Sequence, residues 1–559
     1  MSQLKSQDSW RERRPLLIIV AAFLAWGGWY IWNTSFPING KRFFCLFDDA
    51  MISMRYAQTF AHGQGLVWYP GAERVEGFTN PLWTLLMAAV HLLGLPQNLT
   101  SLSVQLMGLA LLAMNLACVY KISRRLSDNS TLCAIAATLL TAFYLPLNTW
   151  GLQGMEVSLI TLLINASILL ILERIDTPKS LWGVFALLGM AVLTRPDGVI
   201  PYVAVLLFMA VFANPNRIRR LFLGFSFLAS LLLGLTLLRF LYYHDLLPNT
   251  YYLKMTGFPA LLRITRGWHM LTNTIEAMGL GFVAAMGVFT TLHIRRKEIF
   301  LLGAVLAAQA AYSVYVGGDA WEWFGPSYPN RYLCVAMPGF FILFTLAAKW
   351  LLIDSFPVMS LSLSSFTRVL RQFVFILLIG LAWLSFHGAN TPRGMNRFLE
   401  NMRVERGTPL HVMYNSFNVL AALWLRETCP PDTAVAVRWA GSSPYFSGFP
   451  TIDMLGKCDR RIAHMKVPGT DWRNFYPGHI KFDLSYSMDQ LKPDVVLPYT
   501  WTTPYKGYVK VGSIDELSLY VRQDRTDLVQ AIQTRSEAAT ASYLSLCSYW
   551  HRLPQPTQR

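Results

Sequence analysis

Long apolar runs recur along the first two-thirds of this chain, and they constrain its fold more than any other feature. Several of them approach or exceed the ~20 residues that a helix needs to cross the ~30 Å hydrocarbon core of a bilayer. Hydrophobic residues make up 53% of the 559 residues and charged residues only 14%, whereas a soluble protein carries roughly a quarter charged residues. The sequence therefore predicts a polytopic α-helical membrane protein.

Eleven spans are predicted, at 15–32, 101–120, 131–148, 155–172, 180–194, 198–213, 221–242, 268–291, 299–316, 332–352 and 372–388. Basic residues follow every second span, for example Arg124 and Arg295, and they also precede the first span. Because basic loops stay in the cytoplasm, the N-terminus is predicted to be cytoplasmic and the C-terminal part extracytoplasmic. The formal charge of +16 follows this topology, so we expect no nucleic-acid partner.

Residues 82–95 are also apolar, but the stretch between Pro81 and Pro96 is too short for an untilted crossing. Counting it as a span would also place the basic loops outside. We therefore expect a helix in the outer interface or partly buried in the bundle, within a first external loop at 33–100.

The composition changes near residue 389, where long apolar runs end and charged and turn residues return. An amphipathic helix is predicted at 417–426. Short strands are predicted at 434–437, 494–497, 508–511 and 517–521. We expect a transmembrane domain at 1–388 and a soluble extracytoplasmic α/β domain at 389–559.

The seven cysteines lack the paired spacing of a zinc site. Cys429 and Cys458 both fall in the predicted external domain, where disulfides persist. We expect these two to be bonded, with Cys547 as a competing partner.

Two adjacent carboxylates, Asp48 and Asp49, follow the first span in the stretch Asp-Asp-Ala-Met-Ile-Ser-Met-Arg-Tyr-Ala. Paired charges beside a membrane are costly and usually functional. A solvated loop is the alternative for such a pair taken alone.

Further polar motifs end or follow the outward-running spans. They are Glu76–Trp83, Gly151–Glu156, Leu193–Gly198, Leu246–Lys254, Val316–Asp319 and Asn330–Tyr332. Each alone is typical of a polar loop cap. Their placement together on the outer side predicts a single active site there.

These motifs resemble those of GT-C glycosyltransferases, and they are most similar to the terminal β-arabinofuranosyltransferases of mycobacterial cell-wall arabinan. The resemblance covers most of residues 40–340 and extends more faintly to Asp453-Met-Leu-Gly and to Arg461–His464. Gln153 and Met155 replace an expected Glu-Thr-like pair, and the Gly-Gly-Asp loop is longer and richer in aromatic residues (Trp321, Trp323 and Phe324).

The resemblance implies an inverting enzyme of the bacterial inner membrane. It would move arabinofuranose from a polyprenyl-phosphate-linked donor to a glycan or glycoprotein acceptor on the outer face. Asp48 or Asp49 would be the base that deprotonates the acceptor, and the other would orient the acceptor or a divalent cation (Mg²⁺, Mn²⁺ or Ca²⁺) held by the pair.

Lys254, Arg331 and Arg195 are the predicted ligands of the donor phosphate. The predicted substrate-binding residues are Arg55, Glu76, Asn80, Glu156, Asp197, Asn249, Tyr251 and Asp319. Arg55 has a second interpretation, in which it pairs with the two aspartates. Tyr251 also has a second interpretation, in which it belongs to the aromatic belt at the membrane interface.

Two other functions fit a chain of this kind. A transporter or flippase of lipid-linked glycans usually has gating groups on both sides of the membrane, whereas the inner loops here carry basic residues and little else. A non-catalytic cell-envelope assembly protein would tolerate loss of both aspartates. In the external domain we expect an acceptor-binding surface formed by Trp439, Tyr445, Phe446, Trp472 and Tyr476, with an ordinary core as the alternative.

Overall fold

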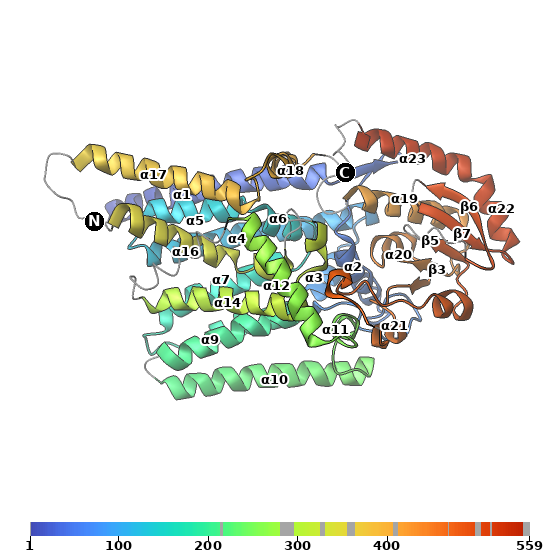
Figure 1. The fold of residues 1–559 in the computed structure, drawn as a ribbon, viewed down its shortest axis with the longest axis horizontal. Helices are drawn as coiled ribbons and strands as arrows, with labels where there is room; N and C mark the ends of the chain where they lie inside the picture. Colours follow the sequence, from blue (N-terminus) through green and yellow to red (C-terminus); the bar gives the residue numbers. More distant parts are fainter. Residues whose placement is uncertain are drawn as a thin grey trace.

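The computed structural model is an elongated helical bundle with a small sheet domain at one end (Figure 1). It describes residues 2–212, 216–279, 296–324, 330–354, 364–405, 412–467, 469–497, 505–514 and 517–551. The bundle helices are α1 (Ser2–Asn33), α4 (Gln97–Leu126), α5 (Thr131–Ala142), α6 (Leu145–Leu152), α7 (Val157–Arg174), α8 (Trp182–Thr194), α9 (Val199–Phe212), α10 (Arg217–Tyr243), α12 (Ala260–Ala277), α14 (Lys297–Val316), α15 (Arg331–Cys334), α16 (Met337–Lys349) and α17 (Ser364–Phe386).

Seven helices within the described ranges are long and apolar enough to cross a membrane. Helices α5 and α6, bent by 51° relative to each other, pass the same test only when they are taken together as one span. The bend falls at Pro146, which sits in the first turn of α6 and lacks the N–H that a continuous helix needs. Two shorter apolar segments, Trp182–Thr194 and Pro196–Phe212, match predicted spans. The polytopic helical fold is therefore confirmed.

One predicted span is shifted. The span expected at 268–291 begins inside α12, which starts earlier, at Ala260. Its second half lies outside the described residues.

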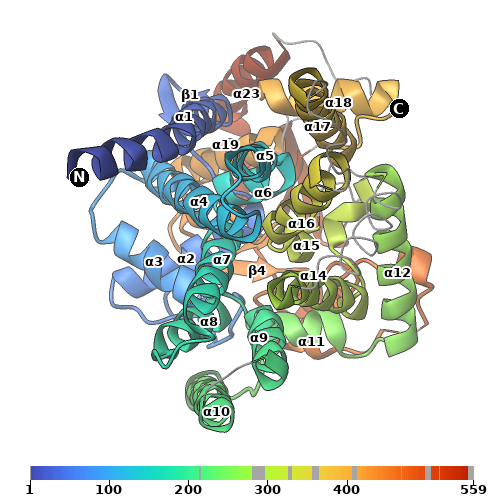
Figure 2. The ribbon, with the colours of Figure 1, turned by 90° about the vertical axis from the view of Figure 1, so that its left-hand side faces the viewer.

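Helix α3 (Pro81–His91) has 11 residues and is not among the helices long enough to cross a membrane, as its length in the sequence predicted. In the view along the bundle, α3 lies at the edge, and α10 stands farthest from the bundle centre (Figure 2). Only 11% of the most apolar window of α10 is buried, so most of its leucines and phenylalanines face outward.

The sheet domain contains β3 (Val435–Val437), β4 (Thr451–Asp453), β5 (Val495–Leu497), β6 (Tyr508–Ile514) and β7 (Leu517–Arg522). The strand order is β4-β3-β5-β7-β6, with β4, β3 and β5 parallel and the β5–β7 and β7–β6 pairs antiparallel. Strands β3 and β5 are buried along their whole length, as expected for parallel strands covered on both faces. The four predicted strands are confirmed, and β4 was not predicted.

Helices accompany this sheet and join it to the bundle: α18 (Pro392–Arg403), α19 (Val412–Thr428), α20 (Ser442–Ser447), α21 (Arg460–His464), α22 (Thr526–Thr534) and α23 (Ser536–His551). The predicted amphipathic helix at 417–426 lies inside α19. Helix α18 packs on the bundle, where the indole Nε1 of Trp26 donates to the carbonyl of Met402 at 3.1 Å.

The junction between bundle and sheet domain holds the β1–β2 hairpin (Phe36–Ile38 and Lys41–Phe43), α2 (Asp48–Ala61), α3 and α11 (Asn249–Met255) (Figure 1). These elements carry several of the polar motifs. The fold thus gathers the motifs where the two parts of the chain meet.

Two expectations about the sheet domain are wrong. The Cys429–Cys458 disulfide is absent, since both thiols are free: Cys458 lies in a turn against α2, and Cys429 follows α19. The second expectation, the acceptor-binding surface, is wrong for two of its five residues. Tyr445 and Phe446 are 1% and 0% exposed, whereas Trp439, Trp472 and Tyr476 are partly exposed. Tyr445 instead contacts His91 through its hydroxyl at 3.1 Å.

Candidate active site

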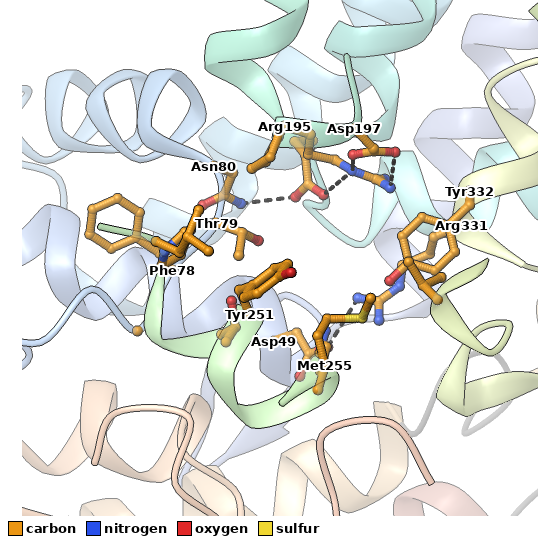
Figure 3. A pocket seen from close by; sticks show the side chains of 18 of the residues that line it. Asp49, Phe78, Thr79, Asn80, Arg195, Asp197, Tyr251, Met255, Arg331 and Tyr332 are labelled. Atoms are coloured by element: carbon orange, nitrogen blue, oxygen red, sulfur yellow. Dashed lines mark hydrogen bonds and ion pairs between the residues drawn. The ribbon is translucent and has the colours of Figure 1, made fainter. Parts of the chain in front are cut away.

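A cavity of about 380 Å³ lies at this junction, and most of its polar lining residues come from the predicted motifs. The predicted site residues that line it are Asp49, Asn80, Glu156, Arg195, Asp197, Tyr251, Lys254 and Arg331. Figure 3 shows Tyr251 pointing into this space, with Asp49 and Arg331 on one side and Arg195 and Asp197 on another. Segments far apart in sequence therefore meet at one site.

Asp49, in the first turn of α2, is the carboxylate of the pair that reaches the cavity. Its Oδ1 accepts from Lys457 Nζ at 2.6 Å and its Oδ2 from the Arg331 guanidinium at 3.0 Å. Burial raises the pKa of Asp49, but the charges of Lys457, Arg331 and Lys254 outweigh it and lower that pKa well below the ordinary range. Asp49 is therefore a carboxylate held ionised by surrounding cations.

Asp48 lies behind its neighbour and does not line the cavity. It is 4% exposed and accepts three hydrogen bonds from the N-terminus of α20: from Ser442 N and Ser442 Oγ, both at 2.8 Å, and from the capping residue Gly441 N at 3.2 Å. Burial raises the pKa of Asp48 despite the opposing effect of Lys457 and these bonds. The two adjacent carboxylates thus have different surroundings, and Asp48 ties α2 to the sheet domain.

Arg331 is held in place from behind by Asp319. The guanidinium donates to Asp319 through Nε at 2.8 Å and through a terminal nitrogen at 3.2 Å, which leaves the other terminal nitrogen for Asp49. Burial lowers the pKa of Arg331, but the charges of Asp319 and Asp49 raise that pKa more strongly, so it lies well above its ordinary value. Asp319 is buried outside the cavity, so it acts on the site through Arg331.

Lys254 lines the same cavity and forms no hydrogen bond or ion pair with any residue that the structure describes. Burial, together with the charge of Arg331, lowers the pKa of Lys254 to about 8, although Asp49 and Asp319 oppose this effect. Lys254 is therefore a cation that faces the cavity with no counterion in direct contact among the described residues. Such a group is suited to bind an anion.

A second polar group closes the cavity at the ends of α7 and α8. Arg195 donates to both oxygens of Asp197 at 2.8 and 2.7 Å and lies 3.6 Å from Glu156. Glu156 also accepts from the amide of Asn80 at 2.9 Å (Figure 3), and Asn80 accepts from Ser53 at 2.8 Å. Arg195 pairs with two carboxylates, so this group offers hydrogen bonds and one negative charge that its single cation does not balance.

Glu76 is buried and pairs with Arg239 of α10 at 2.7 Å. Arg239 lines the cavity but was not predicted as a site residue. The signal was available, since an arginine inside the apolar run at 221–242 is costly unless it is paired.

Lys457 also lines the cavity and was not predicted from the sequence. The Asp453 carboxylate accepts from the backbone N–H groups of Leu455 and Cys458 at 2.9 and 2.7 Å, which builds the turn that presents Lys457. The amide of Asn249 donates to the carbonyls of Gly456 and Lys457, both at 3.0 Å. The Asp-Met-Leu-Gly motif was noted in the sequence, but nothing local indicated that the next residue reaches α2.

The remaining predicted residues lie outside the cavity. Arg55 does not pair with the aspartates: it donates to Gln58 at 2.9 Å and to the Gly448 carbonyl at 2.9 Å, on another face of α2. Asn249 acts on the Lys457 turn. Of the unusual motif residues, Met155 lines the cavity and Trp321 packs on Phe47; the side chains of Trp323 and Phe324 lie outside the described part of the chain.

The aspartate pair is not arranged as a metal site. Asp49 uses both oxygens for cationic side chains, and Asp48 uses both for the N-terminus of α20. In the described ranges there is no group of three or more His, Cys, Asp or Glu residues that could hold a metal ion. The two aspartates, as the described residues surround them, therefore have no free carboxylate oxygen for the predicted divalent cation.

Known structures share this fold. The crystal structure of ArnT from Cupriavidus metallidurans bound to undecaprenyl phosphate matches with a TM-score of 0.56 and 14% identity, over 91% of this chain and 98% of that one. The apo oligosaccharyltransferase of Archaeoglobus fulgidus matches with a TM-score of 0.53 and 12% identity, over 79% of this chain and 64% of that one. The archaeal oligosaccharyltransferase AglB from Archaeoglobus fulgidus, in complex with an inhibitory peptide and a dolichol-phosphate, matches with a TM-score of 0.53 and 13% identity, over 80% and 64%. The chain therefore has the GT-C fold.

In sequence, residues 410–538 match a family described as a domain of unknown function, DUF8728. That segment includes Gly441, Ser442 and Lys457, through which the sheet domain contacts the Asp48–Asp49 pair. No curated protein matches the chain.

Proposed function

We propose that this protein is an inverting glycosyltransferase that uses a polyprenyl-phosphate-linked sugar as donor. The observation that carries the proposal is the placement of Asp49 in a cavity beside Lys254 and Arg331. One carboxylate and a set of cations are what a single displacement at an anomeric carbon needs. The undecaprenyl phosphate and dolichol-phosphate in the similarly folded proteins support a lipid phosphate as the ligand.

Asp49 is the general base in this proposal, and Asp48 anchors α2. The acceptor oxygen attacks the anomeric carbon and its proton passes to an Asp49 oxygen. The bond from that carbon to the phosphate oxygen breaks, and the electron pair stays on the phosphate. The products are the inverted glycoside, the polyprenyl phosphate and a protonated Asp49, which returns its proton to water.

The cations of the cavity stabilise the leaving phosphate. Lys254 has no counterion in contact, and Arg331 is held by Asp319 so that one nitrogen faces the cavity. Charges placed in advance where negative charge grows lower the barrier, because the site need not reorganise during the reaction. Asn80, Glu156 and the Arg195–Asp197 pair supply hydrogen bonds for sugar hydroxyls.

An apolar side of the cavity suits the lipid tail. Ile200 of α9 and Leu232 of α10 line it, and α10 presents most of its apolar surface outward. A prenyl chain leaving the cavity along α10 would pass directly into the bilayer. The phosphate would then be held at the junction while the tail stays in lipid.

We propose arabinofuranose as the sugar and a glycan or glycoprotein at the outer face of a bacterial inner membrane as the acceptor. The sequence motifs support this choice through their resemblance to terminal β-arabinofuranosyltransferases.

The test is transfer by purified protein from a panel of polyprenyl-phosphate sugars, with Asp49→Asn as the matched inactive variant. Arabinofuranosyl transfer is expected. Transfer of a different sugar would overturn the sugar assignment, and no transfer from any lipid phosphate sugar would overturn the enzyme class.

A further inference from the structure

Asp49 as it stands is a poor base. Each of its oxygens already accepts from a cation, Lys457 at 2.6 Å and Arg331 at 3.0 Å. A carboxylate in contact with two positive charges has a low proton affinity, whereas an efficient base needs a pKa nearer the working pH. Something must remove these cations before Asp49 can take the acceptor proton.

Lys457 is the cation best able to change partners. Within the described residues its Nζ donates only to Asp49, while Arg331 keeps two bonds to Asp319 whatever happens at Asp49. The backbone of Lys457 is fixed by Asn249 and the Asp453 turn. The flexible side chain of Lys457 can therefore change partners while its backbone stays in place.

The same cavity is where the donor phosphate would lie. Lys254 lines it without a counterion in contact, and Lys457 and Arg331 line it as well. A phosphate that enters competes with Asp49 for the same two cations.

We propose that the donor phosphate takes over Lys457 and Arg331 from Asp49, and that Asp49 becomes a base only after this exchange. This inference rests on the proposed function and adds an order of events: donor first, acceptor deprotonation second. It also gives the sheet domain a part in the reaction, since Lys457 is its contribution to the site. Lys457 is a positioning residue for Asp49 until it binds the phosphate.

The exchange makes an unusual prediction for binding. Asp49→Asn removes the anion with which the phosphate competes, so this variant should bind undecaprenyl phosphate at least tenfold more tightly while losing turnover. Lys457→Gln should bind it more weakly, and adding Lys457→Gln to Asp49→Asn should cancel most of the gain. Asp245→Asn is the matched control, because Asp245 pairs with Arg460 outside the cavity, and its affinity should equal that of the wild type.

The measurement is an equilibrium titration of the full-length protein in nanodiscs with undecaprenyl phosphate. Unchanged or weaker binding by Asp49→Asn, with normal binding by the wild type, would refute the exchange and leave the proposed function intact. No binding by the wild type would refute the proposed function itself.

A pH profile gives a second, independent readout. Without Lys457 the pKa of Asp49 in the free enzyme rises, so the acid limb of kcat/KM should move to higher pH in Lys457→Gln and return in Lys457→Arg. A merely structural lysine would lower the rate equally at every pH, and that result would overturn the inference.

Discussion

Replacing each aspartate of the pair separately distinguishes the anchor from the base. Asp48→Asn keeps an oxygen for the two bonds from Ser442 but turns an amide N–H₂ toward Gly441 N, which donates to Asp48 at 3.2 Å in the wild type. One lost hydrogen bond to a charged group costs about 1.5–3 kcal/mol. For a domain of the size of the sheet domain, each kcal/mol of lost stability lowers the midpoint of thermal unfolding by about 2–4 °C. The midpoint of Asp48→Asn should therefore fall by roughly 3–12 °C.

Asp49→Asn should behave in the opposite way. The side chain faces the cavity, so water can solvate Lys457 when the charge is removed, while the loss of a general base lowers the rate by about 10²–10⁴-fold. Asp48→Asn should keep its turnover within tenfold of the wild type below its transition.

Scanning fluorimetry in detergent and a single-time-point transfer assay measure both properties on one preparation. Ser442→Ala is the matched control, since it removes one of the three bonds to Asp48 and should give a smaller thermal shift with normal turnover. Near-normal turnover by Asp49→Asn, or a hundredfold loss in Asp48→Asn with an unchanged transition, would refute this division of roles.

Three further outcomes follow from the structure. Since the pKa of Lys254 is lowered to about 8, its ammonium is charged below that pH and neutral above it. Binding of undecaprenyl phosphate should therefore weaken by up to about tenfold per pH unit above pH 8. The Lys254→Arg variant should bind equally well across this pH range in the same titration. Gly441→Ala would place a Cβ 1.9 Å from the backbone oxygen of Asp48, so limited proteolysis should show a loosened sheet domain, whereas Gly469→Ala, which has open space, should resist like the wild type. Chelation with EDTA should leave sugar transfer unchanged, because the carboxylates at the site already bond to side-chain cations; a loss that Mg²⁺, Mn²⁺ or Ca²⁺ restores would contradict this expectation.

Much of the architecture was predictable because its causes are local. A helix that crosses a bilayer must satisfy its own backbone and be apolar over its length, so run length alone located most of the helices of the bundle. Short apolar runs between turn residues did the same for β3, β5, β6 and β7. The short α3 was distinguished from a span by counting residues between two prolines.

Most of the residues that line the cavity were also predictable, because the membrane topology places their motifs on one side. Motifs that end outward-running helices must lie on the same side, and most of them do line one cavity. Residues within these motifs still differ in ways that spacing does not show. Asn249 and Asp319 do not line the cavity but hold Lys457 and Arg331, and Arg55 bonds to the Gly448 carbonyl instead.

The rest depended on which distant segments touch. Asp48 and Asp49 are neighbours in sequence with the same chemistry, yet one meets the loop at Gly441 and the other meets Lys457 and Arg331. The Cys429–Cys458 pairing failed for the same reason, since a shared compartment does not place two thiols in contact. Sequence by itself determined where helices, strands and polar motifs lie, because those follow from hydrophobicity and local backbone chemistry. Only the tertiary structure decided which carboxylate faces the cavity, which cation reaches that carboxylate and which arginine is paired. These depend on contacts between residues up to about four hundred positions apart.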